Sequence, residues 1–88
     1  MPFEWDTKKA ARVLEERAID FEDVALIFDQ PHIIISSDQK GEKRWLIIGI
    51  VDGQCVTGVY TVREDTIRII SARRSRKHEQ GWYCARYA

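Results

Sequence analysis

The 88-residue sequence has few of the features that mark membrane, secreted or metal-binding proteins. Its longest apolar stretch, residues 45–62, is interrupted by Asp52-Gly53, so we expect no segment that spans a bilayer. The opening MPFEWD lacks the basic-then-apolar layout of a signal peptide, which favours a cytoplasmic location. Only two cysteines occur, Cys55 and Cys84. Without an export signal or metal-ligand spacing, both are expected to be reduced thiols.

The motifs of several common enzyme classes are also missing. The sequence has no glycine-rich phosphate loop, no nucleophile elbow and no cysteine–histidine pair at a useful spacing. Its two histidines, His32 and His78, lack the neighbouring ligands that zinc or iron needs, so we expect no metal site and no cofactor. The length predicts a single domain, and 44% hydrophobic with 32% charged residues is typical of a globular protein.

What the chain does contain is an uneven distribution of charge. Its net charge of zero combines a net −5 over residues 1–42, with five basic and ten acidic residues, and a net +5 over residues 43–88, with nine basic and four acidic residues. Such asymmetry indicates an anionic partner for the basic half. The alternative is that acidic helices simply pack beside basic strands.

Local patterns predict an α+β fold. Asp6 is a suitable N-cap for a helix over residues 7–17, and Asp20 caps a second helix that ends before Pro31. Residues 3–5 form either a short strand or an aromatic arm. Strands are expected at 32–37, 43–51, 54–62 and 66–73, with hairpin turns at 52–53 and 63–65, and a last helix at 75–87. The resulting architecture is two N-terminal helices, an antiparallel three- to four-stranded sheet and a C-terminal helix.

A cluster of basic side chains follows the last predicted strand, in IRIISARRSRKHE (67–79). Strict alternation along this strand places Ile67, Ile69 and Ser71 on one face and Arg68, Ile70 and Ala72 on the other. The strand then ends at two arginines, and other arginines lie at the ends of neighbouring strands. Guanidinium groups bind phosphates, and nearby tyrosines can stack on bases, so we expect a phosphate-binding rim of the sheet. Its expected members are Arg44, Arg63, Arg73, Arg74, Tyr60 and Tyr83.

Each of these residues also has a purely structural interpretation. The arginines can pair with nearby carboxylates, and the tyrosines can belong to the edge of the core. His78 lies within the basic run, where it can serve as an acid or base or simply as a surface residue. The carboxylates available for such pairing are Glu42, Glu64, Asp65 and Glu79.

Four segments resemble the BrnT family of toxins from bacterial type II toxin–antitoxin pairs. They are FEWD (3–6), DFEDVALIFDQP (20–31), GEKRW (41–45) and, most specifically, VYTVREDTIRIISARRSRKHE (59–79). The resemblance covers nearly the whole chain, in order. It implies a fold related to the RelE-type ribonucleases and a cytoplasmic, metal-independent endoribonuclease that cleaves RNA and arrests growth.

The resemblance also implies partners. They are an RNA substrate and a BrnA-like antitoxin with a ribbon-helix-helix domain; promoter DNA is contacted only through that antitoxin, and a dimer is expected within the complex. The polar positions that match the family are Arg44, Tyr60, Arg63, Glu64, Arg73, Arg74, Glu79 and Tyr83. One motif departs: members usually carry Lys-His-Gly before the second helix, where this chain has Glu16, Arg17 and Ala18.

RNA supplies its own nucleophile, the 2′-hydroxyl, so rigidly placed arginines can stabilise the crowded phosphate without a metal. We expect Arg63, Arg73 and Arg74 to clamp the phosphate, Glu64 or Glu79 to act as base, and Tyr60 or His78 as acid. Further RNA contacts are expected from Arg44, Arg68, Arg76, Lys77 and Tyr83. Two alternatives stay open: a nucleic-acid-binding protein without catalysis, and a module whose basic surface only docks an acidic antitoxin segment.

Overall fold

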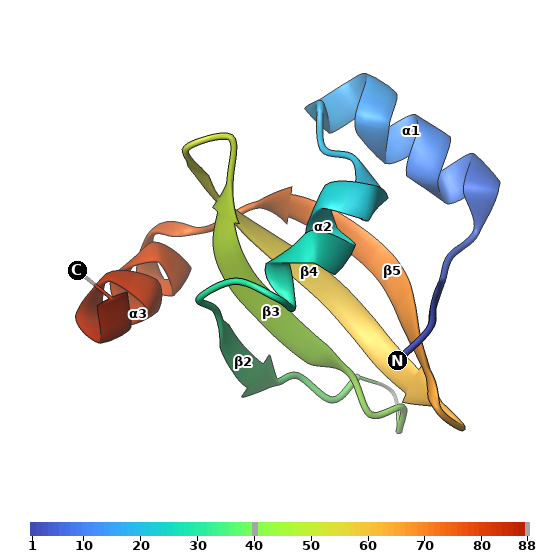
Figure 1. The fold of residues 1–88 in the computed structure, drawn as a ribbon. Helices are drawn as coiled ribbons and strands as arrows, with labels where there is room; N and C mark the ends of the chain where they lie inside the picture. Colours follow the sequence, from blue (N-terminus) through green and yellow to red (C-terminus); the bar gives the residue numbers. More distant parts are fainter. Residues whose placement is uncertain (40, 88) are drawn as a thin grey trace.

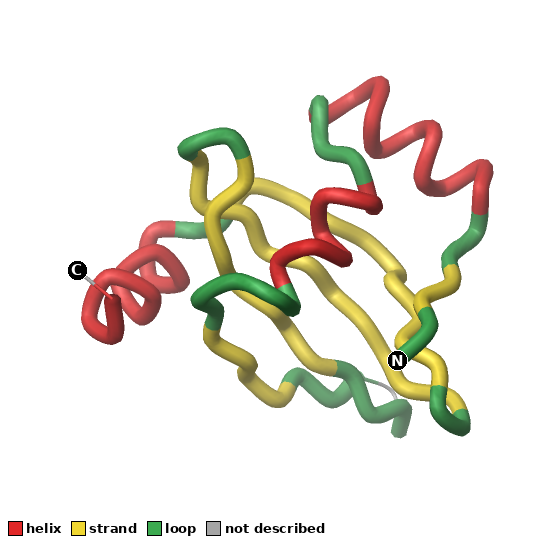
Figure 2. Tube along the Cα trace, viewed as in Figure 1, coloured by secondary structure: helices red, strands yellow, loops and turns green. Residues whose placement is uncertain are grey.

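The computed structural model describes residues 1–39 and 41–87, and its elements confirm the predicted α+β class (Figure 1). Figure 2 shows the helices segregated from the strands. The helices are α1 (Thr7–Arg17), α2 (Phe21–Ile27) and α3 (Lys77–Tyr87). The strands are β1 (Phe3–Glu4), β2 (Ile33–Ser36), β3 (Trp45–Val51), β4 (Gln54–Arg63) and β5 (Thr66–Arg74). None of the described helices is long and apolar enough to cross a membrane.

The sheet has one strand more than the antiparallel meander expected from the sequence. Strands β2 to β5 pair antiparallel in chain order, as predicted, and β1 adds to the outer edge of β5 in parallel, giving the order β1-β5-β4-β3-β2. Phe3 lies opposite Ile67, so the N-terminal segment is a strand rather than a free arm. The β3–β4 hairpin turns at Asp52 and Gly53, which both have positive φ angles, 50° and 77°. That conformation suits a tight two-residue turn.

Both N-terminal helices begin at the predicted caps. The Asp6 carboxylate accepts a hydrogen bond from the Lys9 amide at 2.9 Å, and that of Asp20 accepts one from the Glu22 amide at 2.9 Å. Helix α1 ends at Ala18, whose φ of 57° lies in the left-handed region that glycine prefers. Arg17 then donates from Nη1 to the Ala72 carbonyl at 2.8 Å, which attaches the end of α1 to β5.

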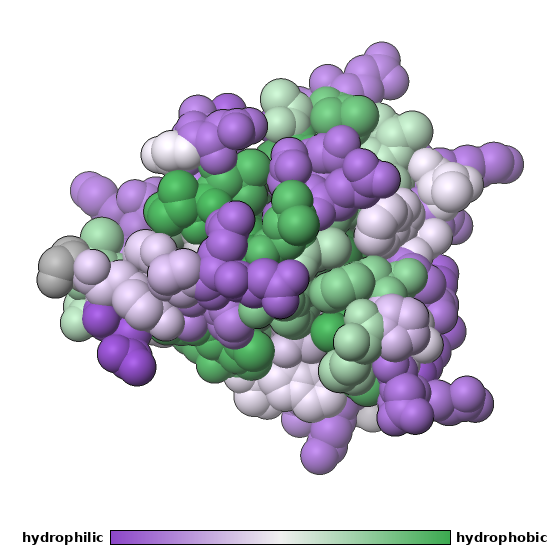
Figure 3. Space-filling model, viewed as in Figure 1, coloured by the Kyte–Doolittle hydropathy of each residue, from purple (hydrophilic) through white to green (hydrophobic). Residues whose placement is uncertain are grey.

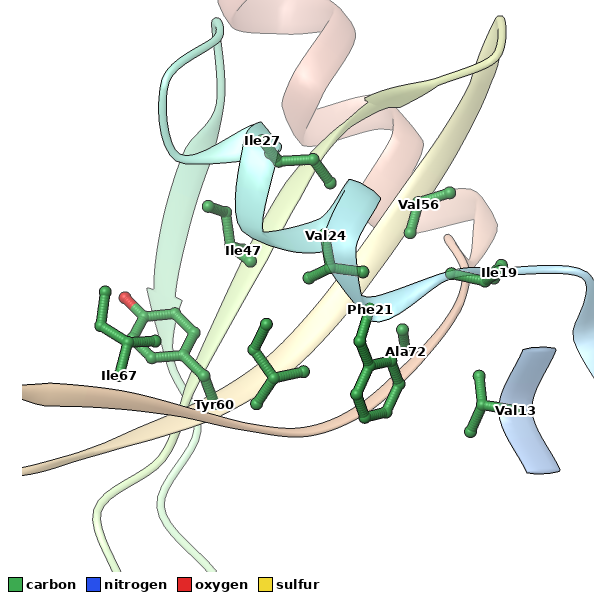
Figure 4. Close-up of a cluster of buried hydrophobic side chains, with 11 residues drawn as sticks. Val13, Ile19, Phe21, Val24, Ile27, Ile47, Val56, Tyr60, Ile67 and Ala72 are labelled. Carbon is green, nitrogen blue, oxygen red and sulfur yellow. The ribbon is translucent and has the colours of Figure 1, made fainter. Parts of the chain in front are cut away.

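One face of the sheet packs against α1 and α2 to form the core (Figure 4). Helix α2 approaches closely because β4 presents Gly58 beneath it: a Cβ there would lie 2.6 Å from Cγ1 of Val24. The buried core residues are Val13, Ile19, Phe21, Val24, Ile27, Ile47, Val56, Tyr60, Ile67, Ile69 and Ala72. Some apolar surface remains exposed over α2 and the β3–β4 turn, where Leu26 and Ile50 lie (Figure 3).

Helix α3 lies at the other end of the molecule from α1 (Figure 1). It contacts β3, and its buried acid Glu79 contacts Thr57 of β4. Thr57 alternates along β4 with Val56 and Gly58, which face the core. Helix α3 therefore packs on the face of the sheet opposite to α1 and α2, and it leaves part of that face uncovered.

Strand β5 does not alternate as predicted, because it contains a β-bulge. Tyr60 pairs with Ile69, but its neighbour Val59 pairs with Ser71, so Ile70 is an extra residue without a partner on β4. A one-residue insertion reverses the direction of every side chain that follows it. Ala72 consequently enters the core in place of Ser71, and Arg73 emerges on the opposite face.

Candidate nucleic-acid interface

A cavity of about 380 Å³ lies on the sheet face opposite to the core. Its floor is formed by side chains that alternate with core residues, such as Leu46, Val59 and Ser71. Helix α3 and the segment that precedes β3 form its walls. This volume is in the range of small-ligand sites. The lining residues are Lys9, Ser37, Gln39, Arg44, Leu46, Val59, Ile70, Ser71, Arg73, Arg76, His78, Glu79 and Trp82.

The charge of this cavity is positive. Four lining residues are cations, Lys9, Arg44, Arg73 and Arg76, whereas Glu79 is the one carboxylate among the described lining residues. With His78 neutral, the lining carries a formal charge of +3. A concave surface of one sign attracts and concentrates oppositely charged ligands. An anionic ligand therefore fits this cavity far better than a cationic one.

Arg73 is held by a bidentate ion pair with Glu79. Its Nη1 and Nη2 lie 2.6 and 2.8 Å from Oε1 and Oε2 of Glu79, which is 1% exposed. The Arg76 amide at 2.8 Å and the Thr57 hydroxyl at 3.0 Å also donate to Oε1. Mainly because of the Arg73 hydrogen bonds, the pKa of Glu79 falls to about 2, and the pKa of Arg73 rises. Glu79 is therefore a fixed anion that orients Arg73, and it is unsuited to act as the base.

Arg44 lies across the cavity from this pair, and it is also partly neutralised. Its Nη2 lies 3.1 Å from Oε2 of Glu42, a half-exposed ion pair of the kind that contributes little to stability. Its Nε atom is inaccessible to solvent and has no hydrogen-bond partner among the described residues. Arg44 thus has one buried donor that no described residue satisfies.

His78 is the one of the two predicted acids, Tyr60 and His78, that lines the cavity. It lies on α3 four residues before Trp82, and the two rings make an edge-to-face contact at 5.0 Å between centroids. Trp82 is 44% exposed and also lines the cavity. An exposed aromatic ring next to several cations is the combination that binds single-stranded nucleic acids, through stacking and phosphate contacts.

The structure does not bring Tyr60, Arg63 and Glu64 to this cavity. Tyr60 is 6% exposed and stacks on Trp45 at 5.8 Å in the core, and its burial raises its pKa. Arg63 and Glu64 lie at the β4–β5 turn. Arg63 is six residues along β4 from Thr57, the partner of Arg73, which corresponds to about 20 Å. The expected single rim of four arginines is therefore not formed, because the two ends of β4 point to opposite ends of the sheet.

The other expected RNA contacts are spread around the cavity. Arg74 and Lys77 are exposed near its α3 side without lining it. Tyr83 packs against Tyr87 with 5.0 Å between ring centroids, and Tyr87 donates to the His32 carbonyl at 2.9 Å, so this aromatic pair anchors α3 instead. Arg68 lines a neighbouring hollow and pairs with Glu4 at 2.6 Å.

Sequence reasoning missed Lys9, which reaches the cavity from α1. The one available signal was its position, because lysines in the first turn of a helix face an unfavourable dipole.

The family departure at Glu16, Arg17 and Ala18 lies at the end of α1, and none of these residues lines the cavity. Among residues 1–39 and 41–87, no group of three or more potential metal ligands comes together. Cys55 and Cys84 are unbonded.

Comparisons with known proteins bear on the fold and on the family of this chain. The fold is similar to that of the Brucella abortus ribonuclease toxin BrnT, with a TM-score of 0.70 and 20% sequence identity, over 88% of this chain and 99% of that chain. No curated protein has a significantly similar sequence. The model of the family described as "Ribonuclease toxin, BrnT, of type II toxin-antitoxin system" matches residues 5–79. Because that match spans most of the chain, this protein belongs to the BrnT family of ribonuclease toxins of type II toxin–antitoxin systems.

Proposed function

We propose that this chain is a cytoplasmic, metal-independent endoribonuclease that cleaves single-stranded RNA in the basic cavity and thereby arrests growth. The observation that carries the proposal is the +3 cavity, which combines an oriented arginine, Arg73, with an exposed histidine and tryptophan. Its one described carboxylate is already saturated with hydrogen bonds, so the lining offers no free carboxylate to hold Mg²⁺.

Five of the lining residues have roles in this mechanism. Arg73 uses two of its five N–H groups on Glu79 and a third, at 3.5 Å, on the Arg74 carbonyl, which leaves two for a phosphate. Arg76 and Lys9 add charge that stabilises the phosphorane formed when the 2′-hydroxyl attacks. His78 takes the proton of the attacking 2′-hydroxyl and then gives a proton to the 5′-oxygen that leaves phosphorus, because histidine is the residue that most often transfers protons in enzymes. Trp82 stacks on a base next to the cleaved bond.

The activity is tested with purified protein and labelled RNA in excess chelator. We expect cleavage that leaves 2′,3′-cyclic phosphate ends, because the nucleophile is internal. His78→Ala is expected to lower kcat by about 10²–10⁴, and Arg76→Ala by about 10². Arg63→Ala is the contrasting variant: because Arg63 does not line the cavity and lies about 20 Å along β4 from Thr57, the strand partner of Arg73, we expect nearly full activity. A loss in Arg63→Ala equal to that in Arg76→Ala would place the site at the β4–β5 turn instead.

Expression in growing cells tests the toxin role. The wild-type chain should stop growth in the absence of its antitoxin, and His78→Ala should not. We place the contact with a BrnA-like antitoxin at α3, where Trp82 and Tyr87 are 44% and 41% exposed. A partner seated there would cover Trp82 and close the cavity, which accounts for neutralisation. Co-expression with the antitoxin should restore growth, because the bound antitoxin keeps RNA out of the cavity.

RNA binding without cleavage is the second candidate function. Its support is that the central arginine is paired with Glu79 and that His78 is the single histidine among the described lining residues. In that case the protein retains RNA in a salt-sensitive complex, and the RNA stays intact after long incubation in the same assay.

A further inference from the structure

A second hollow of about 390 Å³ lies beside the cavity, along an edge of β5 that β1 leaves open. Strand β1 pairs with β5 through only two residues, at Ile67 and Arg68, so the edge beyond Arg68 has no strand partner on that side. We call this hollow the α1 groove. Its lining residues are Asp6, Lys8, Lys9, Arg12, Arg68, Ile69 and Ile70. Lys9 and Ile70 also line the basic cavity, so the two hollows adjoin.

The α1 groove is strongly basic, and three of its four cations form no ion pair among the described residues. Its four cations face one carboxylate, Asp6, which is already used to cap α1 by accepting the Lys9 amide. Arg68 pairs with Glu4 on the exposed surface. Within the described part of the chain, the side chains of Lys8, Lys9 and Arg12 form no ion pair, so all three remain available to an external anion.

The positions of these cations are unfavourable for the helix that carries them. Lys8 and Lys9 lie in the first turn of α1, which contains no acidic residue, although the helix dipole favours anions there. Lys8 and Arg12 are four residues apart on one helix face, and like charges at that spacing repel. The folding of α1 does not explain this arrangement, whereas an anionic ligand in the groove does.

We propose that the α1 groove is a binding subsite for the sugar-phosphate backbone of the same RNA strand that enters the cavity. This inference rests on the proposed function, because the shared residue Lys9 makes the groove a continuation of the cleavage site. Lys8 and Arg12 each contact a phosphate, Lys9 is shared with the cavity, and Ile69 and Ile70 provide an apolar floor. Contacts of this type position a strand without reading its sequence. Longer RNAs are therefore bound more tightly than those that fill the cavity alone.

The test uses the double variant Lys8→Ala/Arg12→Ala, which leaves Lys9 and the whole cavity lining intact. Both changes introduce alanine, the best helix former, and remove charge repulsion, so α1 should fold at least as well as before. The matched control is Lys43→Ala/Arg86→Ala, which removes the same charge from exposed residues that line neither hollow. The probe is a fluorescent 2′-O-methyl RNA of about twelve nucleotides, which lacks the attacking hydroxyl and so reports binding alone.

We expect the Lys8/Arg12 variant to bind this probe about tenfold more weakly at low salt. The plot of log K against log salt should be shallower for the variant than for the wild type, by about 1.4 in slope. Cleavage of a trinucleotide, which is too short to reach the groove, should be unchanged. Binding equal to that of the wild type, or an equal loss in the control, overturns the subsite. Loss of antitoxin binding with normal RNA binding also overturns it, in favour of an acidic protein segment as the occupant.

The outcomes distinguish this inference from the proposed function. If the wild type binds the probe through the groove but leaves natural RNA intact, the nuclease proposal fails and the subsite stands. If the wild type cleaves both long and short RNA and the Lys8/Arg12 variant does so equally well, the nuclease proposal stands and the subsite fails.

Discussion

At the scale of single residues, the Glu79 carboxylate is the most constrained group on the cavity side of the sheet. It accepts hydrogen bonds from Arg73, Thr57 and the Arg76 amide, and Thr57 also shares a hydrogen bond with the Ser75 hydroxyl at 2.7 Å. These contacts join β4, β5 and the start of α3. Removing Arg73 would leave a buried carboxylate without its partner, which is strongly destabilising. An Arg73→Ala variant therefore measures folding as much as RNA chemistry, and Arg76 and His78 are the better probes.

Glu79 also makes stability depend on pH. Its pKa is about 2 in the folded chain against an ordinary value of 4.5, so it stabilises the fold above about pH 4.5, and this contribution is lost as the pH falls towards 2. The difference corresponds to about 3 kcal/mol. We expect Glu79→Gln to be less stable by about this amount at pH 7 and to approach the wild type near pH 2.

Urea unfolding at several pH values measures this effect. Glu15→Gln, on the exposed face of α1, is the control, and its stability should follow that of the wild type at every pH. A Glu79→Gln deficit that stays constant from pH 7 to pH 2 would contradict the assignment, because it would show that the ionised carboxylate is not the stabilising form.

At the scale of secondary-structure elements, the close approach of α2 to the sheet depends on the glycine at position 58 of β4, which has no side chain. A Cβ on Gly58 would lie 2.6 Å from Cγ1 of Val24 and 3.2 Å from Cγ2 of Ile47. We expect Gly58→Ala to destabilise the fold by about 1–3 kcal/mol, because α2 must move outwards. Removing the obstructing methyl with Val24→Ala should reduce the destabilisation caused by Gly58→Ala.

A double-mutant cycle on thermal or urea unfolding tests this coupling. Gly81→Ala serves as the control, because a Cβ at Gly81 meets no atom within 4 Å. Gly81 lies inside α3, where alanine is the better helix former, so we expect this change to raise the free energy of unfolding by about 1 kcal/mol. Additive costs for Gly58→Ala and Val24→Ala would show that the two residues do not limit the approach of α2.

The sequence was sufficient to predict most elements because their signals are local. The caps Asp6 and Asp20 and the Asp52-Gly53 turn each act within a few residues. Two features depend on distant partners and were not predictable in this way. The parallel pairing of Phe3 with Ile67 joins residues that lie 64 positions apart in the sequence, and the bulge at Ile70 depends on the register with β4.

The bulge also explains why the candidate site was only partly predicted. Arg73 and Arg76 were expected near a phosphate, and both line the cavity, but strict alternation would have directed Arg73 towards the core face. Arg63 was grouped with them because it lies close in sequence to β5, although the length of β4 separates the two ends. Lys9 was missed because the approach of α1 to β5 is a tertiary contact that no local pattern encodes.

At the scale of the whole molecule, the zero net charge combines acidic and basic groups that are unevenly distributed. Acidic residues are concentrated on the later part of α1 and on α2, which pack on the core face, for example Glu15, Glu16, Glu22 and Asp23. The cations of the cavity and the α1 groove lie on the opposite face and along the β5 edge. Such a separation orients the protein as it approaches a polyanion, although its total charge gives no attraction.

This separation predicts a steep salt dependence for RNA binding by the wild-type chain. Four cations of the two hollows form no ion pair within the described residues: Lys8, Lys9, Arg12 and Arg76. For single-stranded RNA, each phosphate that a protein neutralises adds about −0.7 to the slope of log K against log salt. Log K against log salt, measured by anisotropy with the non-cleavable RNA, should therefore have a slope of about −3. A protein whose RNA binding depended only on its net charge would show almost no salt dependence. A slope shallower than about −1 would mean that these side chains do not act together on one strand, and the basic face would then have to serve a different partner.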